Sequence, residues 1–182
     1  MKVKGTAIEG LLIIEPRVFR DGRGYFFESF REEDFLHPGP DYRFVQDNQS
    51  SSAYGVIRGL HFQQGAAAQA KLVRVVSGTI YDVAVDLRPG SPTFGKWYGL
   101  ELSDTNFLQL LIPRGFAHGF SVLSESAVVF YKCDAYYNKE AETGIRYNDP
   151  DLDINWMVPH GKCLVSEKDL QLPLLKELNI HG

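Results

Sequence analysis

Residues 55–78, GVIRGLHFQQGAAAQAKLVRVVSG, decide the predicted fold, because they contain two β-like runs joined by a loop of small residues. The runs, 55–63 and 70–76, are rich in Val, Ile, Leu and Phe, as β-strands are. They also carry three polar groups that such strands do not need for folding: Arg58, His61 and Lys71. We expect a hairpin that brings these groups within reach of one another, facing either water or a pocket.

Short β-like runs recur on both sides of this segment, roughly every 8–12 residues, with Gly and Pro turns between them. In TIYDVAVDL (79–87) the odd-numbered residues share a face, and in IPRGFAHGFSVLS (112–124) a turn leads into a strand. We interpret NQSSS (48–52) as a polar stretch of turn-forming residues, and SEKDLQLPLLKEL (166–178) as a short helix interrupted by proline. The pattern favours a β-sandwich or barrel.

Chain length and composition indicate one domain over residues 1–182, with 44% hydrophobic and 23% charged residues. A closed jelly roll fits the pattern best, because such a barrel can gather polar side chains from several strands in one interior cavity. The net charge of −4 does not indicate broad attraction to nucleic acid or to an anionic membrane. Cys133 and Cys163 form no short-spaced pair, which argues against a disulfide framework or a zinc site.

Segments that would direct the chain to a membrane are not found in the sequence. The first residues, MKVKGTAIEG, lack the apolar core of a signal peptide. No apolar run approaches the ~20 residues needed to span a bilayer. We therefore expect a cytoplasmic protein without a nucleic-acid or membrane partner.

The pattern PxGxxH at residues 113–118 resembles the second motif of the metal-binding cupins, a jelly-roll superfamily. The first motif of those proteins supplies a His-x-His pair and a following Glu. The corresponding stretch here reads His61-Phe62-Gln63, and no Glu follows before Lys71. A transition-metal site generally needs three or more good ligands. We expect the jelly roll without the metal.

Local sequence leaves several roles open. Arg58 and His61 have opposite parity on an ideal strand, so both reach one cavity only if Gly59 permits a bulge. Asp169 lies in the pattern Ser166-x-x-Asp, which fits a helix cap as well as a catalytic carboxylate. For any one of the cations taken alone, exposure to solvent is the better interpretation: Arg23, Arg58, Lys71, Arg74 and Lys168. Three tyrosines can equally be packing aromatics: Tyr131, Tyr136 and Tyr137.

Long, ordered and mutually spaced motifs run through the chain: DGRGYFFESF (21–30), FVQDNQSSS (44–52), GVIRGLHFQ (55–63), KLVRVVSG (71–78), DVAVDLRPGSPTFGKW (82–97), IPRGFAHGFSVLS (112–124), YKCDAYY (131–137) and SEKD (166–169). On these motifs the sequence resembles the dTDP-4-dehydrorhamnose 3,5-epimerase family, also called dTDP-4-dehydro-6-deoxyglucose 3,5-epimerases. The resemblance covers essentially the whole chain. One departure is Gln49, where the family often has His; it falls on no residue assigned to catalysis.

The resemblance implies an all-β, cupin-type jelly-roll barrel with a few short peripheral helices, acting as an isomerase without metal or other cofactor. The implied substrate is dTDP-4-dehydro-6-deoxy-α-D-glucose, and the implied product is dTDP-4-dehydro-β-L-rhamnose, on the route to dTDP-L-rhamnose. The implied assembly is a homodimer.

Residue roles follow from the resemblance, position by position. His61 would be the general base, Asp169 its carboxylate partner, and Tyr131 the proton donor on the opposite face of the sugar. Lys71 would lie near the developing enolate oxygen. Further positions would contact the substrate: Arg23, Glu28, Gln46, Asn48, Arg58, His118, Glu142 and Lys168. Tyr137 would stack on the thymine, and an N-terminal group would reach the partner subunit's site: Arg23, Phe26 and Glu28.

The implied chemistry suits these residue types. A C4 ketone acidifies the hydrogens at C3 and C5, so a base can remove one and an acid across the ring can return a proton to the other face. Imidazole, with an ordinary pKa of about 6.5, suits the base, and a carboxylate can orient it. A Tyr hydroxyl can donate the proton, and a Lys can stabilise the enolate. Arg and Lys would meet the diphosphate.

Three alternatives stay open at this point. A relative of the same family could act at C3 or C5 only, on a related dTDP-4-keto-6-deoxy sugar. A metal-dependent cupin oxygenase would need bound metal for activity. A non-catalytic nucleotide-sugar binding module would bind the ligand without turnover.

Overall fold

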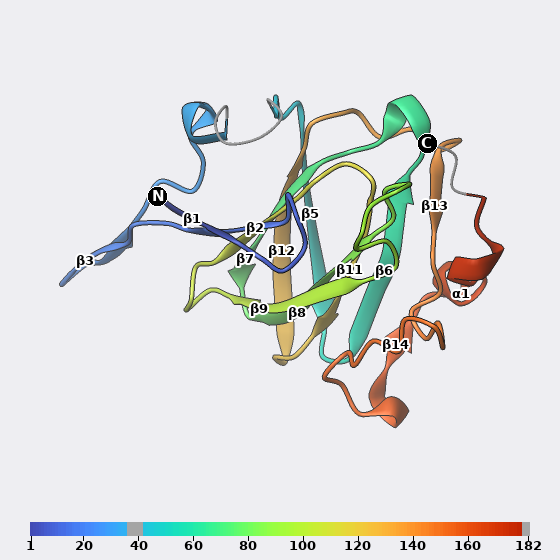
Figure 1. The fold of residues 1–182 in the computed structure, drawn as a ribbon. Coiled ribbons are helices and arrows are strands. Elements are labelled where there is room, and N and C mark those ends of the chain that lie inside the picture. The colour runs from blue at the N-terminus through green and yellow to red at the C-terminus, as the bar shows by residue number, and fades with distance from the viewer. Residues whose placement is uncertain (36–41, 180–182) are drawn as a thin grey trace.

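Two antiparallel sheets that face each other make up most of the structure, a computed structural model that describes residues 1–35 and 42–179 (Figure 1). The first sheet runs in the order β1-β2-β10-β7-β12-β5: β1 Lys2–Gly5, β2 Leu12–Glu15, β10 Gln109–Ile112, β7 Lys71–Ser77, β12 Ser126–Cys133 and β5 Gln46–Ala53. The second runs β13-β6-β11-β8-β9, with β14 parallel to β6: β13 Glu142–Gly144, β6 Val56–Gln63, β11 Phe116–Val122, β8 Thr79–Asp86, β9 Trp97–Ser103 and β14 Leu164–Val165.

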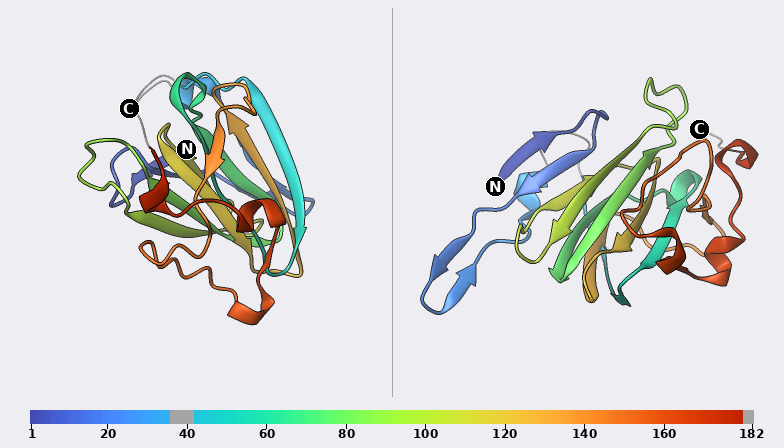
Figure 2. Two further views of the ribbon diagram at one scale, coloured as in Figure 1. Left: turned by 90° about the vertical axis from the view of Figure 1, so that its right-hand side faces the viewer. Right: turned by 90° about the horizontal axis from the view of Figure 1, so that it is seen from below.

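The remaining elements are peripheral. A two-stranded hairpin, β3 Phe19–Asp21 and β4 Gly24–Phe26, projects from the body of the molecule (Figures 1 and 2). The C-terminal segment contains the short helix α1, Glu167–Leu170, and single 3₁₀ turns occur elsewhere: η1 Glu32–Phe35, η2 Gly65–Ala67, η3 His160–Lys162 and η4 Leu175–Glu177. No helix among the described residues is long and apolar enough to cross a membrane.

The main hydrophobic core lies between the two sheets. The first sheet contributes residues such as Val73 and Leu110, and the second contributes residues such as Ala84, Phe116 and Phe120. The outer face of the second sheet is covered by the C-terminal segment, and the outer face of the first by residues before β5. These layers confirm the predicted all-β, cupin-type jelly roll with short peripheral helices.

The predicted hairpin over residues 55–78 is wrong. Strand β6 belongs to the second sheet, where it pairs with β11 and β13, whereas β7 belongs to the first, where it pairs with β10 and β12. The loop after Gln63, which contains η2, exceeds the roughly two to five residues of an ordinary hairpin turn and crosses between the sheets. His61 and Lys71 therefore stand on opposite sheets.

The interpretation of residues 48–52 as a turn is also wrong, because β5 continues through them to Ala53. Asn and Ser favour turns through local hydrogen bonds. Here a continuous ladder with β12, from Gln46 opposite Cys133 to Ala53 opposite Ser126, outweighs that preference. The strand alternates between partly buried and exposed residues, so its inner side is a polar row.

A bulge in β6 brings Arg58 and His61 to the same face. In the pairing with β11, His61 lies opposite His118 and Arg58 lies opposite Phe120, so two residues of β6 occupy the place of one. Gly59, at φ 125°, makes the bulge feasible, because a Cβ there would lie 2.5 Å from the Cα of Gly119. The condition set by the sequence, a bulge at Gly59, is confirmed.

We predict that Gly59→Ala lowers the free energy of unfolding by about 2 kcal/mol or more, because a side chain at this φ is strained and meets backbone. Urea unfolding followed by circular dichroism measures the change. Gly161→Ala is the matched control, since a Cβ at Gly161 meets nothing within 4 Å. Equal stability of the two variants would contradict the prediction.

Candidate active site

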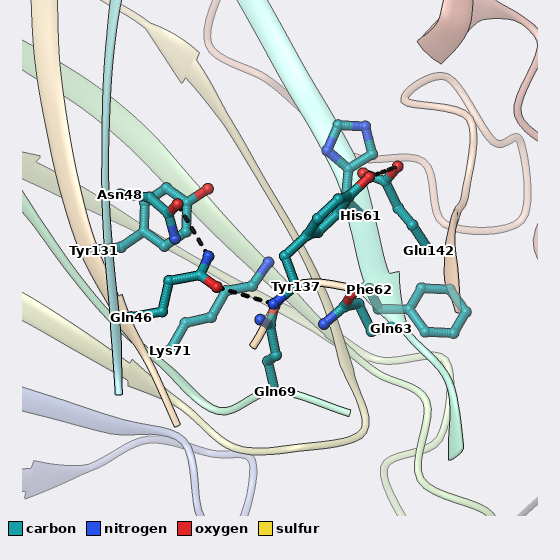
Figure 3. A pocket seen from close by; sticks show the side chains of 10 residues that line it. All are labelled: Gln46, Asn48, His61, Phe62, Gln63, Gln69, Lys71, Tyr131, Tyr137 and Glu142. Carbon is teal, nitrogen blue, oxygen red and sulfur yellow. Dashed lines mark hydrogen bonds between the residues drawn. The ribbon is translucent and has the colours of Figure 1, made fainter. Parts of the chain in front are cut away.

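A cavity of about 230 Å³ opens between the two sheets (Figure 3). One side is formed by β5, β7 and β12, and the other by β6 and β13. The lining combines amides, an imidazole, an ammonium, phenols and a carboxylate: Gln46, Asn48, His61, Phe62, Gln63, Gln69, Lys71, Tyr131, Tyr137 and Glu142. Seven of these are residues that the sequence analysis named: Gln46, Asn48, His61, Lys71, Tyr131, Tyr137 and Glu142.

The predicted base and acid lie on opposite sides of this cavity. Tyr131 of β12 lies beside Asn48 of β5, its register partner, on the side of the first sheet (Figure 3). His61 of β6 lies on the other side, near Glu142 (Figure 3). Lys71 of β7 belongs to the same side as Tyr131, with its Nζ 5.8 Å from the centroid of the Tyr131 ring. A ring bound between the sides can meet a different group on each face.

His61 is paired with a buried carboxylate. Its Nε2 lies 2.8 Å from Oδ1 of Asp169, and the Asp169 side chain is 6% exposed. Burial alone would raise the pKa of Asp169, but the hydrogen bonds from His61 and from the N–H of Gly59 outweigh it and hold that pKa below its ordinary value. The carboxylate is therefore charged at neutral pH and can orient the imidazole.

The structure is compatible with both interpretations of the Ser166-x-x-Asp pattern, a helix cap and a carboxylate that faces the site. Ser166 is the N-cap of α1, and its Oγ accepts a hydrogen bond from the backbone N–H of Asp169 at 3.1 Å. The carboxylate of Asp169 points the other way, to His61 and to the N–H of Gly59 at 3.3 Å. The cap thus fixes the helical turn that presents the carboxylate.

Two further titratable groups of the cavity have shifted pKa values. Burial lowers the pKa of the partly buried Lys71, and the acidic groups of Cys133, Asp82 and Glu142 oppose that shift. Burial raises the pKa of Tyr131, with smaller contributions in the same direction from Cys133 and Glu142, whereas the guanidinium of Arg58 lowers it. The phenol is protonated at neutral pH, as a proton donor must be.

Tyr137 crosses the mouth of the cavity and is 51% exposed (Figure 3). Its hydroxyl donates to Oε2 of Glu142 at 2.9 Å, and its backbone N–H donates to Oε1 of Gln46 at 2.9 Å. Lys168 donates to the same Oε2 of Glu142. The ring is held at the entrance with one face open, a position suited to stacking on a planar group.

A second hollow, of about 580 Å³, adjoins the cavity and shares His61 with it. It is lined by further predicted site residues, namely Arg58, Lys168 and Asp169. Nε of Arg58 donates to Oγ of Ser52 at 2.9 Å, which fixes one edge of the guanidinium. The cations that a diphosphate would need are thus beside the His61 ring.

Four predicted residues do not line either hollow. His118 is buried behind His61, its register partner on β11, and its Nε2 lies 2.7 Å from Oδ1 of Asp82. The other three lie on or just after the β3–β4 hairpin and are exposed: Arg23, Phe26 and Glu28. Arg23 is paired with its neighbour Asp21 at 2.6 Å. Within one chain the hairpin lies on the opposite side of the molecule from β6 and β13, which form one side of the cavity (Figure 1).

Four residues of the site were missed by sequence reasoning. Gln63 follows His61 by two positions, so strand alternation could have placed both on the cavity side. Its Oε1 accepts from the N–H of Asn138 at 2.6 Å. Asp82 is a charge on the inner face of an apolar strand, which is also a readable signal. Gln69 has no such signal, because its place depends on the loop that crosses between the sheets. Phe62 has none either, because its apolar side chain also packs in the hydrophobic cluster with Val83 and Val85.

In the described part of the chain, no group of three or more His, Cys, Asp or Glu side chains is arranged to hold a metal ion. The two histidines of the cupin-like motifs are each paired with a carboxylate, His61 with Asp169 and His118 with Asp82.

Comparison with known proteins identifies the family. The profile of the family described as dTDP-4-dehydrorhamnose 3,5-epimerase matches residues 5–177. The dTDP-4-dehydrorhamnose 3,5-epimerase of Escherichia coli K12 is 52% identical over 179 residues, which cover 98% of this chain and 96% of the relative.

Solved structures agree with the sequence comparison. The crystal structure of dTDP-4-dehydrorhamnose 3,5-epimerase from Elizabethkingia anophelis superposes with a TM-score of 0.95 at 54% identity, covering 98% of each chain. The dTDP-6-deoxy-D-glucose-3,5-epimerase of Legionella pneumophila, in complex with dTDP-4-keto-L-rhamnose, gives a TM-score of 0.94 at 47% identity, covering 98% of this chain and 94% of that one. By sequence and by fold, this chain belongs to the dTDP-4-dehydrorhamnose 3,5-epimerase family of isomerases.

Proposed function

We propose that this protein inverts C3 and C5 of dTDP-4-dehydro-6-deoxy-α-D-glucose to give dTDP-4-dehydro-β-L-rhamnose, in the biosynthesis of dTDP-L-rhamnose. Residues 1–182 act as one epimerase domain. The observation that carries the proposal is the His61–Asp169 pair on one side of the cavity with Tyr131 on the other. Membership of the family supports the choice of substrate.

In this scheme His61 removes the proton at each of the two centres, C3 and C5. Because Nε2 of His61 donates to Asp169, the lone pair that takes the proton is on Nδ1. The charged carboxylate of Asp169 stabilises the imidazolium that forms, as in other carboxylate–imidazole pairs. The pair is rigid, since Asp169 is buried and is also bonded to the N–H of Gly59.

Tyr131 delivers the proton from the other face, and Lys71 stabilises the enolate between the two steps. The C–H bond breaks at the His61 side, negative charge collects on O4, and the ammonium of Lys71 meets it there. A C–H bond then forms at the Tyr131 side, which inverts the centre. Every role is filled by a side chain of the protein.

The remaining polar groups bind the nucleotide part of the substrate. Arg58 and Lys168 meet the diphosphate, for which local cations suffice on a chain of net charge −4. Tyr137 stacks on the thymine at the mouth of the cavity. Polar groups of the cavity hold the sugar and its linkage: Gln46, Asn48 and Glu142. His118 lies behind His61 and is bonded to Asp82, so it acts from behind the cavity lining rather than from its surface.

We further propose that the active unit is a homodimer in which the β3–β4 hairpin completes the partner subunit's site. The hairpin pairs with no other strand in the described part of the chain, and it carries apolar side chains exposed to solvent, with Phe26 66% exposed. Exposed apolar groups of this kind mark interaction surfaces. Arg23, Phe26 and Glu28 are the residues that would enter the partner's site.

We predict that turnover in deuterated water places deuterium at both C3 and C5 of the product, because each inversion takes its new proton from an exchangeable group. Mass spectrometry and proton NMR of the product locate the label. Label at only one carbon would instead support a single-site epimerase. Complete absence of exchange would support a non-catalytic binding module.

We predict that His61→Ala lowers kcat by about 10³-fold and that Asp169→Asn lowers it by about 10²-fold or more, because each removes part of the base. Binding of dTDP, measured by calorimetry, should change little in either variant. His160→Ala is the matched control, since His160 is exposed and lines neither of the two hollows of the site. Turnover of His61→Ala at the wild-type rate would rule out the assigned base.

We predict that co-expressed Arg23→Ala and His61→Ala chains recover activity that neither variant shows alone. A mixed dimer contains one site with His61 from one chain and Arg23 from the other, and that site is intact. Tagged, purified heterodimers should reach about half the wild-type kcat per dimer, as one site of two is restored. Failure of the heterodimer to recover activity would place both residues in the same subunit's site.

A further inference from the structure

Two loops that cross between the sheets lie side by side at the mouth of the cavity. The crossover loop, residues 64–70, leads from β6 of the second sheet to β7 of the first. The mouth loop, residues 134–141, leads back from β12 of the first sheet to β13 of the second, and it carries Tyr137. Strand pairing brings the two loops together at both ends, because β7 pairs with β12 and β6 pairs with β13.

Two glutamine side chains join these loops. Oε1 of Gln63, the last residue of β6, accepts from the backbone N–H of Asn138 at 2.6 Å. Its Nε2 donates to the carbonyl of Ala67 at 3.0 Å, so one side-chain amide bridges the two loops. Nε2 of Gln69 donates to the carbonyl of Ala135 at 2.7 Å. Gln63 is buried, at 7% exposed, and Gln69 is half-buried.

The backbone is held on both sides of Tyr137. The N–H of Tyr137 donates to Oε1 of Gln46 at 2.9 Å (Figure 3), and the N–H of the next residue donates to Gln63. The two peptide groups that flank the Cα of Tyr137 are planar, so only φ and ψ of this residue relate them. Each peptide group is held by a glutamine from a different sheet. Both angles are therefore restrained, and with them the direction in which the side chain leaves the backbone.

The hydroxyl of Tyr137 completes the restraint at the far end of the side chain. It donates to Oε2 of Glu142 at 2.9 Å, and Glu142 is the register partner of Gln63. Neighbouring residues of the second sheet thus hold both the backbone and the ring. Gln46 and Glu142 have a place in the proposed function, as groups that hold the sugar. Gln63 and Gln69 line the cavity as well, and that function gives them no role.

We propose that Gln63 and Gln69 are positioning residues that hold Tyr137 ready to stack on the base of a nucleoside diphosphate sugar. The inference rests on the stacking role that the proposed function gives to Tyr137. Both amides act through the backbone of the mouth loop, so neither needs to touch the ligand. A ring that is ordered before binding loses less conformational entropy when the base arrives. An apolar side chain at Gln63 would suit the buried position, but it would leave the N–H of Asn138 without this partner.

Hydrogen exchange of the ligand-free protein tests the contact without relying on turnover. Met is similar in length to Gln and has no amide. In Gln63→Met we expect the backbone amide of Asn138 to exchange about tenfold faster than in the wild type, measured by NMR. Gln64→Met is the matched control, because Gln64 is the exposed neighbour and lines neither hollow. An unchanged rate at Asn138 in Gln63→Met would remove Gln63 as a restraint on the mouth loop.

Two probes separate the nucleobase from the diphosphate. We expect the Kd of dTDP, measured by calorimetry, to rise about tenfold in Gln63→Met and about threefold in Gln69→Met, the less buried of the two. The Kd of inorganic pyrophosphate should keep its wild-type value in both variants, because the cations proposed for that group, Arg58 and Lys168, line the second hollow. Equal weakening of both probes, or an unchanged Kd of dTDP, would overturn the inference.

A double-mutant cycle shows whether Gln63 acts through the ring of Tyr137. In the Tyr137→Ala background we expect Gln63→Met to change the Kd of dTDP by less than about twofold, because the ring that it positions is gone. A tenfold loss that persists in this background would mean that Gln63 contacts the ligand directly, which would refute the positioning role.

Kinetics provide a further readout. We expect KM to rise about tenfold in Gln63→Met with kcat within about twofold of the wild type, since the ring meets the base and not the reacting carbons. A fall in kcat at unchanged KM would contradict this. Absence of epimerisation by the wild-type protein would refute the proposed function, whereas hydrogen exchange and dTDP binding would still decide the role of the two glutamines.

Thermal unfolding by circular dichroism shows whether each variant is folded. If Gln63→Met does not fold, Gln69→Met decides the matter, because its amide holds the same loop two residues before Tyr137. An unchanged Kd of dTDP in folded Gln69→Met would then overturn the inference.

Discussion

The carboxylate of Asp169 joins the C-terminal segment to strand β6 at two points, and the site depends on that contact. One oxygen lies 2.8 Å from Nε2 of His61, and the other accepts from the N–H of Gly59 at 3.3 Å. Gly59 is the residue at which β6 bulges, so the same carboxylate supports the ring and the backbone irregularity that aims it. A four-residue helix could not hold this position by itself; its Ser166 cap and the pairing of β14 with β6 place it.

Around that contact, polar side chains of the site occupy interior positions of the barrel that could otherwise hold apolar core residues. Inner positions that could hold an apolar side chain hold His61, Lys71 and Tyr131, each forgoing roughly 1.5–3 kcal/mol of burial. A buried charged group needs a hydrogen-bonding partner. The carboxylate of Asp82 is fully enclosed, and its partner is the imidazole of His118. The apolar core between the sheets continues at Val73 and Phe120, which keeps this polar region confined. The same strands thus carry apolar core residues over one part of their length and polar site residues over another.

Prediction from sequence succeeded where alternation and turn residues gave a direct signal. The face shared by Val83, Val85 and Leu87 packs in one cluster, and the motif after residue 112 is a turn into a strand. It failed where a long-range pairing overrides a local preference: β5 runs through Asn48 to Ser52 because β12 supplies a continuous ladder. The predicted hairpin at residues 55–78 was wrong for the same reason. Strands that pair within these sheets are often far apart in the sequence, as β6 and β11 are.

By itself the sequence determined the fold class, the family and the residue types of the site, because strand periodicity and long spaced motifs are properties of the chain. It also stated the condition for Arg58 and His61 to share a face, a bulge at Gly59. Only the tertiary structure decided that the bulge forms and that His61 and Lys71 lie on opposite sheets. The resemblance had implied the pairing of Asp169 with His61, and the tertiary structure provides the contact, across more than a hundred residues of sequence. These are contacts between distant segments, and their energies arise from packing and hydrogen bonds that no local pattern encodes.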